Sequence, residues 1–246
     1  QSIKGCFDEI VFVDTGSTDN SVQFLENINK QISDGITAWE LPQIKIHHFE
    51  WINDFASARN FAFSKCTKDY IFWCDLDDAM SDAKAFIHWR DNVMHSAHYW
   101  LALYNYAFDG NGNVACQFIR ERVIKRNHGF KWEYPVHEGL IQDEGKRFWP
   151  QRVSSWHINH RRTDDDRKQD HMRNVKIMGD LDLEKVHPRM KFYYGKELFE
   201  NGFPEKAGKP LLEALKSGKL EIHDMLLTIQ YAAQAAMSQN AFVQAA

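Results

Sequence analysis

Three aspartates within four residues are the side chains of this chain best suited to hold a cation. Asp75, Asp77 and Asp78 follow the apolar run from Tyr70 to Cys74. Carboxylates a few ångströms apart repel one another, and in a low dielectric a cation or a shared proton must offset that repulsion. Oxygen ligands at the end of a strand suit Mg²⁺ or Mn²⁺, which keep open positions for water and phosphates. A solvated turn is the alternative, because turns also favour aspartate.

A second polar loop follows another apolar run. Residues 9–13 (EIVFV) read as a buried strand, and Asp14 and Thr15 open the loop behind it. In open α/β sheets, ligands bind at the carboxyl ends of the strands, so we expect both acidic loops at one ligand-binding edge. The loop is not a phosphate-binding loop, since it lacks the G-x-x-x-x-G-K-[ST] pattern. The Asp14 carboxylate instead suits N–H or hydroxyl donors, such as those of a uracil ring or a ribose.

Residues 9–108 alternate between strand-like and helix-like segments, which predicts a mostly parallel sheet covered by helices. A turn rich in Gly and Asn at 109–113 predicts a hairpin between strands at 99–108 and 114–119. A last strand is expected at 152–158, and all residues beyond Asp164 are helical by pattern. The other expected elements are helices from 18 or 19, at 55–66 and at 82–95, and strands at 44–49 and 70–74.

The helical end of the chain has a repeat-like pattern. The run Met190 to Phe199 with a glycine at 195, the turn 201–203, and Ala207 suggest two helices of a tetratricopeptide-like unit. Such a unit cannot bury its apolar face alone, so it needs a neighbour to pack on. A plain helical cap on the sheet domain is the alternative.

Composition excludes several classes of protein. The chain has 246 residues, 43% hydrophobic and 26% charged, as expected for a globular protein with one substantial core. Its net charge of −4 provides no basic field for nucleic acid, so we expect no nucleic-acid partner. We expect no transmembrane segment and no signal peptide, and therefore a cytoplasmic protein. The four cysteines lack the C-x-x-C spacing, which predicts reduced thiols and disfavours a cysteine-bound zinc.

Four motifs in order resemble those of family two glycosyltransferases, which have the GT-A fold. They are residues 11–19 (VFVDTGSTD), 54–60 (DFASARN), 75–78 (DLDD) and 132–138 (WEYPVHE). Related members also carry a tetratricopeptide-like helical region. The resemblance implies an α/β fold with a mixed, Rossmann-like GT-A sheet and flanking helices over residues 1–163, and a small all-α region over 164–246. The family's domain opens with an apolar strand, which this sequence does not include.

The resemblance also implies roles for single residues. Asp14 would accept hydrogen bonds from the nucleotide base, with Thr15 in the same loop, and Arg59 would line that pocket or offset diphosphate charge. Asp75 would reach the ribose or a metal-bound water. Asp77 would bind Mn²⁺ or Mg²⁺, while Asp78 would either support the metal ligands from behind or hold the loop that follows, and the resemblance does not decide between these two roles.

An inverting transfer also needs a base that takes the acceptor's proton. Glu138 is the candidate, because the nearby Trp132 and Tyr134 would partly desolvate its carboxylate and raise its pKa. His137 is a second candidate for the base. A Glu138 that simply pairs with a nearby arginine (Arg120, Arg122 or Arg126) is the structural alternative.

One histidine is a candidate for the metal. The resemblance suggests a downstream histidine as a further ligand, and His157, near the end of the last expected strand, fits that place. A core or surface histidine is the alternative, and His160 is a weaker candidate.

Together these features imply an inverting, metal-dependent glycosyltransferase that moves a sugar from a nucleotide-sugar donor, with a UDP-sugar as the expected donor. Its acceptor would be a peptide, a protein or a glycan. Two other classes remain open at this stage. One is a metal-dependent phosphohydrolase that uses the same carboxylates, and the other is a catalytically silent scaffold whose helices bind a peptide.

Overall fold

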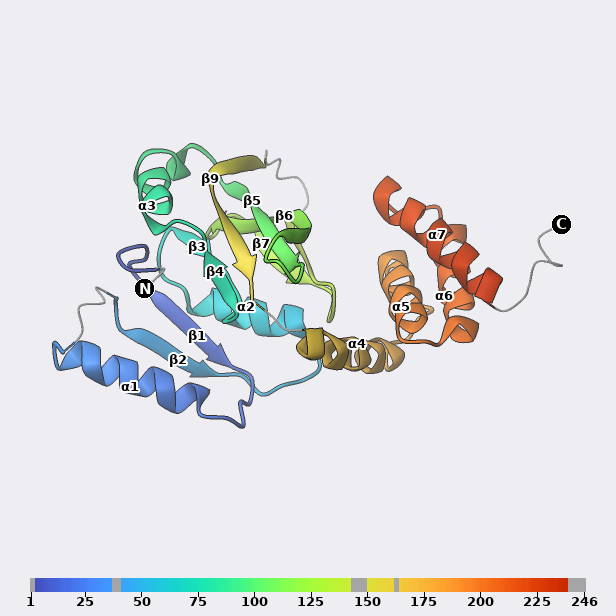
Figure 1. The fold of residues 1–246 in the computed structure, drawn as a ribbon, viewed down its shortest axis with the longest axis horizontal. Coiled ribbons are helices and arrows are strands. Elements are labelled where there is room, and N and C mark those ends of the chain that lie inside the picture. Colours follow the sequence, from blue (N-terminus) through green and yellow to red (C-terminus); the bar gives the residue numbers. More distant parts are fainter. Residues whose placement is uncertain (1–2, 37–40, 143–149, 162–163, 239–246) are drawn as a thin grey trace. The chain divides into compact units, whose positions relative to one another are not determined.

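The computed structural model describes residues 3–36, 41–142, 150–161 and 164–238. The chain forms two compact units (Figure 1). The first comprises residues 1–133 and 139–162, and the second comprises residues 134–138 and 163–246. The expected domain bounds, 1–163 and 164–246, remain a prediction. The second unit differs from the expected helical domain in that it also includes the short segment 134–138.

A parallel pair of strands opens the first unit. β1 (Ile10–Asp14) pairs with β2 (Ile44–His48), and Asp14 lies opposite His48. The helix α1 (Ser21–Ser33) lies between them in the chain, as a parallel pair requires a long connection. The helix expected to start at residue 18 or 19, with that residue as its N-cap, instead begins at Ser21, and its cap position is Asn20, which makes no side-chain cap hydrogen bond.

The main sheet of this unit has five strands in the order β3-β6-β5-β9-β4. β5 runs parallel to β9, and the other neighbours are antiparallel. β7 and β8 form a separate antiparallel pair, which in the described part of the chain is not hydrogen-bonded to the five-stranded sheet. The remaining elements of the unit are α2 (Phe55–Lys65), β3 (Tyr70–Phe72), β4 (Asp78–Met80), α3 (Ala83–Asn92), the 3₁₀ helix η1 (Met94–Ser96), β5 (Tyr99–Phe108), β6 (Val114–Lys125), β7 (Phe130–Glu133), β8 (Gly139–Gln142) and β9 (Gln151–His160).

The mixed sheet with flanking helices that the family resemblance implied is confirmed, whereas the mostly parallel sheet read from the alternating pattern is wrong. The reason is the 109–113 turn, which folds β6 back along β5, as predicted for a hairpin. β6 is long enough to pair with β3 as well, so β3 gains an antiparallel neighbour.

Aromatic side chains fill the core of the five-stranded sheet. The Trp156 ring lies 5.2 Å from the Phe86 ring and 5.3 Å from the Trp89 ring, centroid to centroid. α3 carries Phe86 and Trp89, and its first turn is capped by the Asp82 carboxylate, which accepts from the Ala85 N–H. Asp54 caps α2 in the same way. Both helices that flank the acidic turn (residues 75–78) in sequence thus have a capped first turn, and the aromatic cluster also anchors α3.

β1 and β3 do not pair with each other in the described part of the chain. A cavity of about 670 Å³ lies against both strands, and its lining includes Val11, Phe63 and Phe72. Glu9 lies beside this cavity and holds its surroundings together: its carboxylate binds Lys45 Nζ at 2.5 Å and the Thr67 N–H at 2.7 Å.

The second unit is helical, as the pattern beyond Asp164 predicted. α5 and α6 are joined by the short turn at Asn201 to Phe203, and both begin with proline, whose fixed φ suits a first helical position. Gly195 of α5 lies against Leu211 of α6, so closely that a Cβ there would be 2.5 Å from Leu211 Cγ. The helices are α4 (Asp164–Gly179), α5 (Pro188–Glu200), α6 (Pro204–Lys216) and α7 (Ile222–Ser238).

Two further expectations can be compared with the structure. All four cysteines are free thiols, as predicted. Among the described residues, no helix has the length and apolar character needed to cross a bilayer.

Candidate active site

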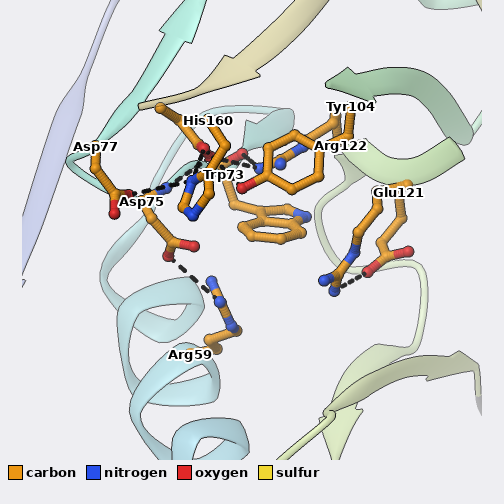
Figure 2. Close-up of polar contacts among 10 residues, drawn as sticks. Arg59, Trp73, Asp75, Asp77, Tyr104, Glu121, Arg122 and His160 are labelled. Atoms are coloured by element: carbon orange, nitrogen blue, oxygen red, sulfur yellow. Dashed lines mark hydrogen bonds and ion pairs between the residues drawn. The ribbon is translucent and has the colours of Figure 1, made fainter. Parts of the chain in front are cut away.

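The centre of the candidate site is the buried carboxylate of Asp78, the first residue of β4. Its Oδ1 accepts a hydrogen bond from the Tyr104 hydroxyl at 2.9 Å and lies 3.1 Å from His160 Nδ1. Its Oδ2 accepts from Arg122 Nη1 and from the Asp75 N–H, both at 3.1 Å. Tyr104, Arg122 and His160, which Figure 2 shows close together, come from β5, β6 and β9. Four donors around two oxygens leave this carboxylate fully hydrogen-bonded.

The pairing of the strands brings these groups together. Asp78 of β4 lies directly opposite His160 of β9 in the antiparallel register. Tyr104 and Arg122 come from β5 and β6, which follow β9 in the sheet. Side chains on one face of neighbouring strands meet, so the sheet itself assembles the network.

Charge inside this network is balanced. Burial by itself would raise the pKa of Asp78, but the hydrogen bond from His160 and the charge of Arg122 outweigh it and hold that pKa below its ordinary value. The side chains of Asp78 and Arg122 are each 1% exposed, so this is a buried ion pair. The Tyr104 pKa is raised by burial and by the Asp78 carboxylate, which keeps the phenol protonated as a donor.

The acidic turn is held in one conformation by Asp78. The Asp78 N–H donates to the Asp75 carbonyl at 3.1 Å, in return for the bond that its carboxylate accepts from the Asp75 N–H. The Asp77 carbonyl accepts from the Arg161 N–H at 2.9 Å. The side chains of Asp75 and Asp77 remain 47% and 29% exposed, so a ligand can reach their carboxylates.

Arginines surround the indole of Trp73 next to this turn. The guanidinium carbons of Arg122 and Arg59 lie 4.2 and 4.3 Å from the ring centroid, and that of Arg120 lies 5.2 Å away. Arg59 also reaches Asp75, with 3.3 Å between Nη2 and Oδ1 (Figure 2). Guanidinium groups are well matched to phosphate oxygens. The site therefore combines carboxylates that could bind a metal cation with arginines that could bind a phosphate.

Three ligand atoms in this site are close enough to share a metal ion. One atom each from Asp77, Asp78 and His160 lie within 4.8 Å of one another. A set with two carboxylates fits the hard divalent cations, although a metal bound by Asp78 would compete with that residue's four hydrogen bonds. Asp77 is therefore the residue best placed to hold the ion, with His160 beside it at 3.6 Å.

The loop after β1 is also preorganised. Asp14 is buried, and its carboxylate accepts from the Gly16 N–H at 3.2 Å and the Ser17 N–H at 3.0 Å. Burial by itself would raise the pKa of Asp14, but its hydrogen bonds with Ser17 and His48 lower it. Thr15 is exposed at the mouth of this loop.

Residues 1–86 match the family model described as Glycosyl transferase family 2. This part of the chain is therefore similar to that family. Over 201 residues it is 24% identical to the SPbeta prophage-derived glycosyltransferase SunS of Bacillus subtilis (strain 168), and to the Glycosyltransferase SunS of Bacillus phage SPbeta. The match covers 80% of this chain and 44% of each relative, so the chain spans less than half the length of the curated relatives it matches.

Solved structures similar to this chain include S. aureus TarS, at 13% identity and a TM-score of 0.46, covering 94% of this chain and 48% of that one. TarS 1-349 in complex with UDP-GlcNAc is similar at 11% identity and a TM-score of 0.43, covering 92% of this chain and 71% of that one.

Several of the expected site residues lie together in the first unit. Asp75, Asp77 and Arg59 all belong to the cluster around Asp78 and Trp73. His157 does not: its N–H donates to Ser81 Oγ and its carbonyl accepts from the Ser81 N–H, and the described cluster takes His160 instead. The roles expected for all of these residues, and for Asp14 and Thr15, remain predictions.

Glu138 belongs to the second unit, in the segment Tyr134–Glu138. Its neighbour His137 directs Nε2 to the Glu197 carboxylate at 2.8 Å, so this nitrogen is already engaged, which weakens the alternative that His137 is the base. Of the three arginines proposed as partners of Glu138, Arg122 pairs with Asp78 and Arg126 donates to the Lys68 carbonyl. Glu138 remains the predicted base.

Sequence reasoning missed the supporting residues of the candidate site. Tyr104 and Arg122 lie on strands that were correctly expected, but nothing in their local sequence marks them as neighbours of Asp78. The available signal was alternation: along 152–160, the residues at 156, 158 and 160 share one face with the core. This would have favoured His160 over His157.

Proposed function

We propose that this domain transfers a sugar from a nucleotide-sugar donor, a UDP-sugar, to a peptide, protein or glycan acceptor, with a divalent metal and with inversion at the anomeric carbon. The observation that carries the proposal is the acidic turn. Asp78 is buried and saturated with hydrogen bonds, while the flanking carboxylates of Asp75 and Asp77 stay accessible beside a group of arginines.

In this mechanism the diphosphate of the donor lies between the two kinds of charge. Asp77 would hold Mn²⁺ or Mg²⁺, and the bound ion would offset the negative charge that grows on the leaving diphosphate. Arg59 stabilises the same charge from the other side, and its guanidinium is already oriented by the Trp73 face and by Asp75. Asp14 accepts hydrogen bonds from the base.

Transfer itself requires one proton to move. The acceptor oxygen or sulfur attacks the anomeric carbon from the face opposite the diphosphate, its proton passes to the Glu138 carboxylate, and the bond between sugar and diphosphate breaks.

The proposal is tested by thermal shift with a panel of nucleotide sugars, with and without manganese. A ligand that binds the folded state alone at about 100 times its dissociation constant stabilises the fold by about 2.7 kcal/mol. We expect a UDP-sugar with manganese to raise the melting temperature most, and Asp77→Ala to abolish the manganese-dependent part. Asp91→Ala is the control, since Asp91 is an exposed residue that pairs with Arg90.

A second variant separates binding from chemistry. Glu138→Gln should keep the donor-induced shift and lose transfer of the sugar, measured by release of the nucleotide in the presence of acceptor. Transfer at the wild-type rate would remove Glu138 from its role. Cleavage of a simple phosphate ester without any sugar acceptor would favour a phosphohydrolase instead, and peptide binding that Asp77→Asn leaves unchanged, with no turnover, would favour a silent scaffold.

A further inference from the structure

The segment Tyr134–Glu138 sits between two paired strands but packs with the helices. β7 ends at Glu133 and β8 begins at Gly139, and these strands pair in the first unit. The five residues between them belong by their contacts to the helical unit. Glu138, the predicted base, is the last of the five.

A buried carboxylate of α5 holds this segment. Glu197 is fully buried, with 1% of its side chain exposed. Its Oε1 lies 2.8 Å from His137 Nε2 and accepts from Asn174 Nδ2 of α4 at 3.2 Å. A carboxylate is costly to bury unless it is hydrogen-bonded, so the position of Glu197 depends on these partners. His137 in turn is tied to the helices rather than left to solvent.

Ring contacts add to this attachment. The His137 imidazole stacks on the Tyr193 ring of α5, with centroids 4.1 Å apart and planes 14° from parallel. The Tyr134 ring lies 5.8 Å from that of His187, the residue before α5. The first and the fourth residue of the segment therefore both contact the region of α5.

The backbone of the segment needs this support, because it is strained. Tyr134 and His137 have φ angles of 77° and 51°, in the left-handed region that residues with a side chain rarely adopt. Such conformations persist only when the surroundings determine them, and they gather at functional sites. Just before the segment, the side chain of Asn60 makes two hydrogen bonds with the backbone of Trp132. Asn60 Nδ2 donates to the Trp132 carbonyl at 2.9 Å, and Asn60 Oδ1 accepts from the Trp132 N–H at 2.8 Å.

From these contacts we infer that Glu197 and His137 form a clamp that sets the backbone of Tyr134–Glu138 and thereby positions Glu138 for transfer. His137 and Glu197 are positioning residues, and the helical unit then contributes to catalysis through them. The inference rests on the proposed function, in which Glu138 accepts the acceptor's proton.

The test compares His137→Ala, Glu197→Gln, Glu197→Ala and the double alanine variant with the wild-type chain. His137→Ala is the decisive variant, since its side chain is 26% exposed and its removal leaves the helices their own core. We expect it to lower kcat for transfer roughly 10- to 100-fold, as expected for a misplaced catalytic group. The KM for the donor should stay within about twofold, because the donor site lies in the first unit.

The other variants show whether His137 and Glu197 act together. Glu197→Gln keeps an acceptor for His137 Nε2 and should retain kcat within about threefold of the wild type. Glu197→Ala should match His137→Ala, and the double variant should lose no more than either, because coupled residues are not additive. Glu200→Gln, on the same helix and paired with Lys196, is the control and should leave kcat unchanged.

Hydrogen exchange of residues 134–138 provides a readout that needs no activity. The alanine variants should exchange these amides faster, while exchange in α6, which carries none of these contacts, stays as in the wild type. A lower kcat with unchanged exchange would overturn the clamp and point to His137 acting directly, and faster exchange with a wild-type kcat would overturn it as well. If the wild-type chain transfers no sugar from any donor, the proposed function fails, whereas the exchange result still decides whether the clamp exists.

Discussion

Asp78 shows how one residue of an acidic cluster can have a structural role. Its carboxylate forms a buried ion pair with Arg122 and also binds Tyr104 and His160. Removing one partner of a buried pair leaves the other charge uncompensated, which costs more than the pair itself contributes. The accessible carboxylates of Asp75 and Asp77 are thus held by a residue that is itself inaccessible.

The first prediction concerns this pair. Asp78→Asn should destabilise the fold by about 3 kcal/mol, because Arg122 stays buried and charged without its anion. The measurement is the free energy of unfolding in urea. Asp91→Asn, which breaks the exposed Asp91–Arg90 pair, is the matched control and should cost no more than about 1 kcal/mol. Equal losses in the two variants would show that the Asp78 pair is worth no more than a surface one.

The acidic turn was predictable at this scale, and its partners were not. Asp75, Asp77 and Asp78 stand next to a recognisable strand, so their proximity follows from local sequence. Asp78 meets His160, 82 residues away, only because β4 pairs with β9. β4 has three residues, too few for a periodic pattern to reveal it, so neither the strand nor its pairing with the strand of His160 was predicted, and His160 was ranked below His157.

At the scale of elements, Glu9 connects three parts of the first unit. Its carboxylate binds Lys45 of β2 and both the N–H and the hydroxyl of Thr67, ahead of β3. Burial by itself would raise the pKa of Glu9, but these bonds lower it from 4.5 to about 2. Because β1 and β3 do not pair with each other in the described chain, this residue is a main link between them.

The second prediction follows from that pKa. A carboxyl group whose pKa is lower in the folded state stabilises the fold above the unfolded pKa, and the contribution is lost as the pH falls through the folded pKa. At about pH 7 the wild type should therefore have a higher melting temperature than Glu9→Gln. This difference in melting temperature should shrink as the pH falls below about 4.5. Glu26→Gln, at an exposed position of α1, is the control. A difference that grows on acidification would contradict the assignment.

The third prediction uses two glycines in neighbouring helices. A Cβ on Gly195 would lie 2.5 and 2.8 Å from two Leu211 carbons and 3.1 Å from the Ala207 carbonyl, whereas one on Gly208 would meet nothing within 4 Å. Gly195→Ala should destabilise the fold by about 1–3 kcal/mol through overpacking. Gly208→Ala should stabilise it by about 0.4–1 kcal/mol, because alanine loses less entropy in a helix. Urea unfolding followed by circular dichroism measures both, and the same sign for both would refute the packing argument.

Elements with strong local patterns were predicted to within a few residues, and pairings were not. The strand at 99–108 and the hairpin turn behind it were found as expected. The parallel sheet was not, because alternation of helix and strand says nothing about which strands a long β6 will join. The short strands β7 and β8 had no usable pattern either.

At the scale of the whole molecule, the two units report through different probes. All eight tryptophans fall within the residue ranges of the first unit, and the second unit has none. Tryptophan fluorescence therefore follows the first unit, while helical circular dichroism includes a large contribution from α4 to α7. A chain of two compact units need not unfold in one step, and coincident transitions by two probes are the test.

The last prediction joins the probes to the variants. If the two units unfold independently, Gly195→Ala should lower the midpoint of thermal unfolding followed by helical circular dichroism (the helical midpoint) by roughly 2–8 °C. The midpoint followed by tryptophan fluorescence (the fluorescence midpoint) should stay unchanged. Glu9→Gln should do the reverse, since Glu9 has its partners in the first unit.

The chain passes between the units on both sides of Tyr134–Glu138, so unfolding of the helices must also release that segment. A loss of transfer that follows the helical midpoint, at temperatures where the tryptophans still report a folded first unit, is therefore the expected result. Both midpoints moving together in either variant would show instead that the chain unfolds as one cooperative body.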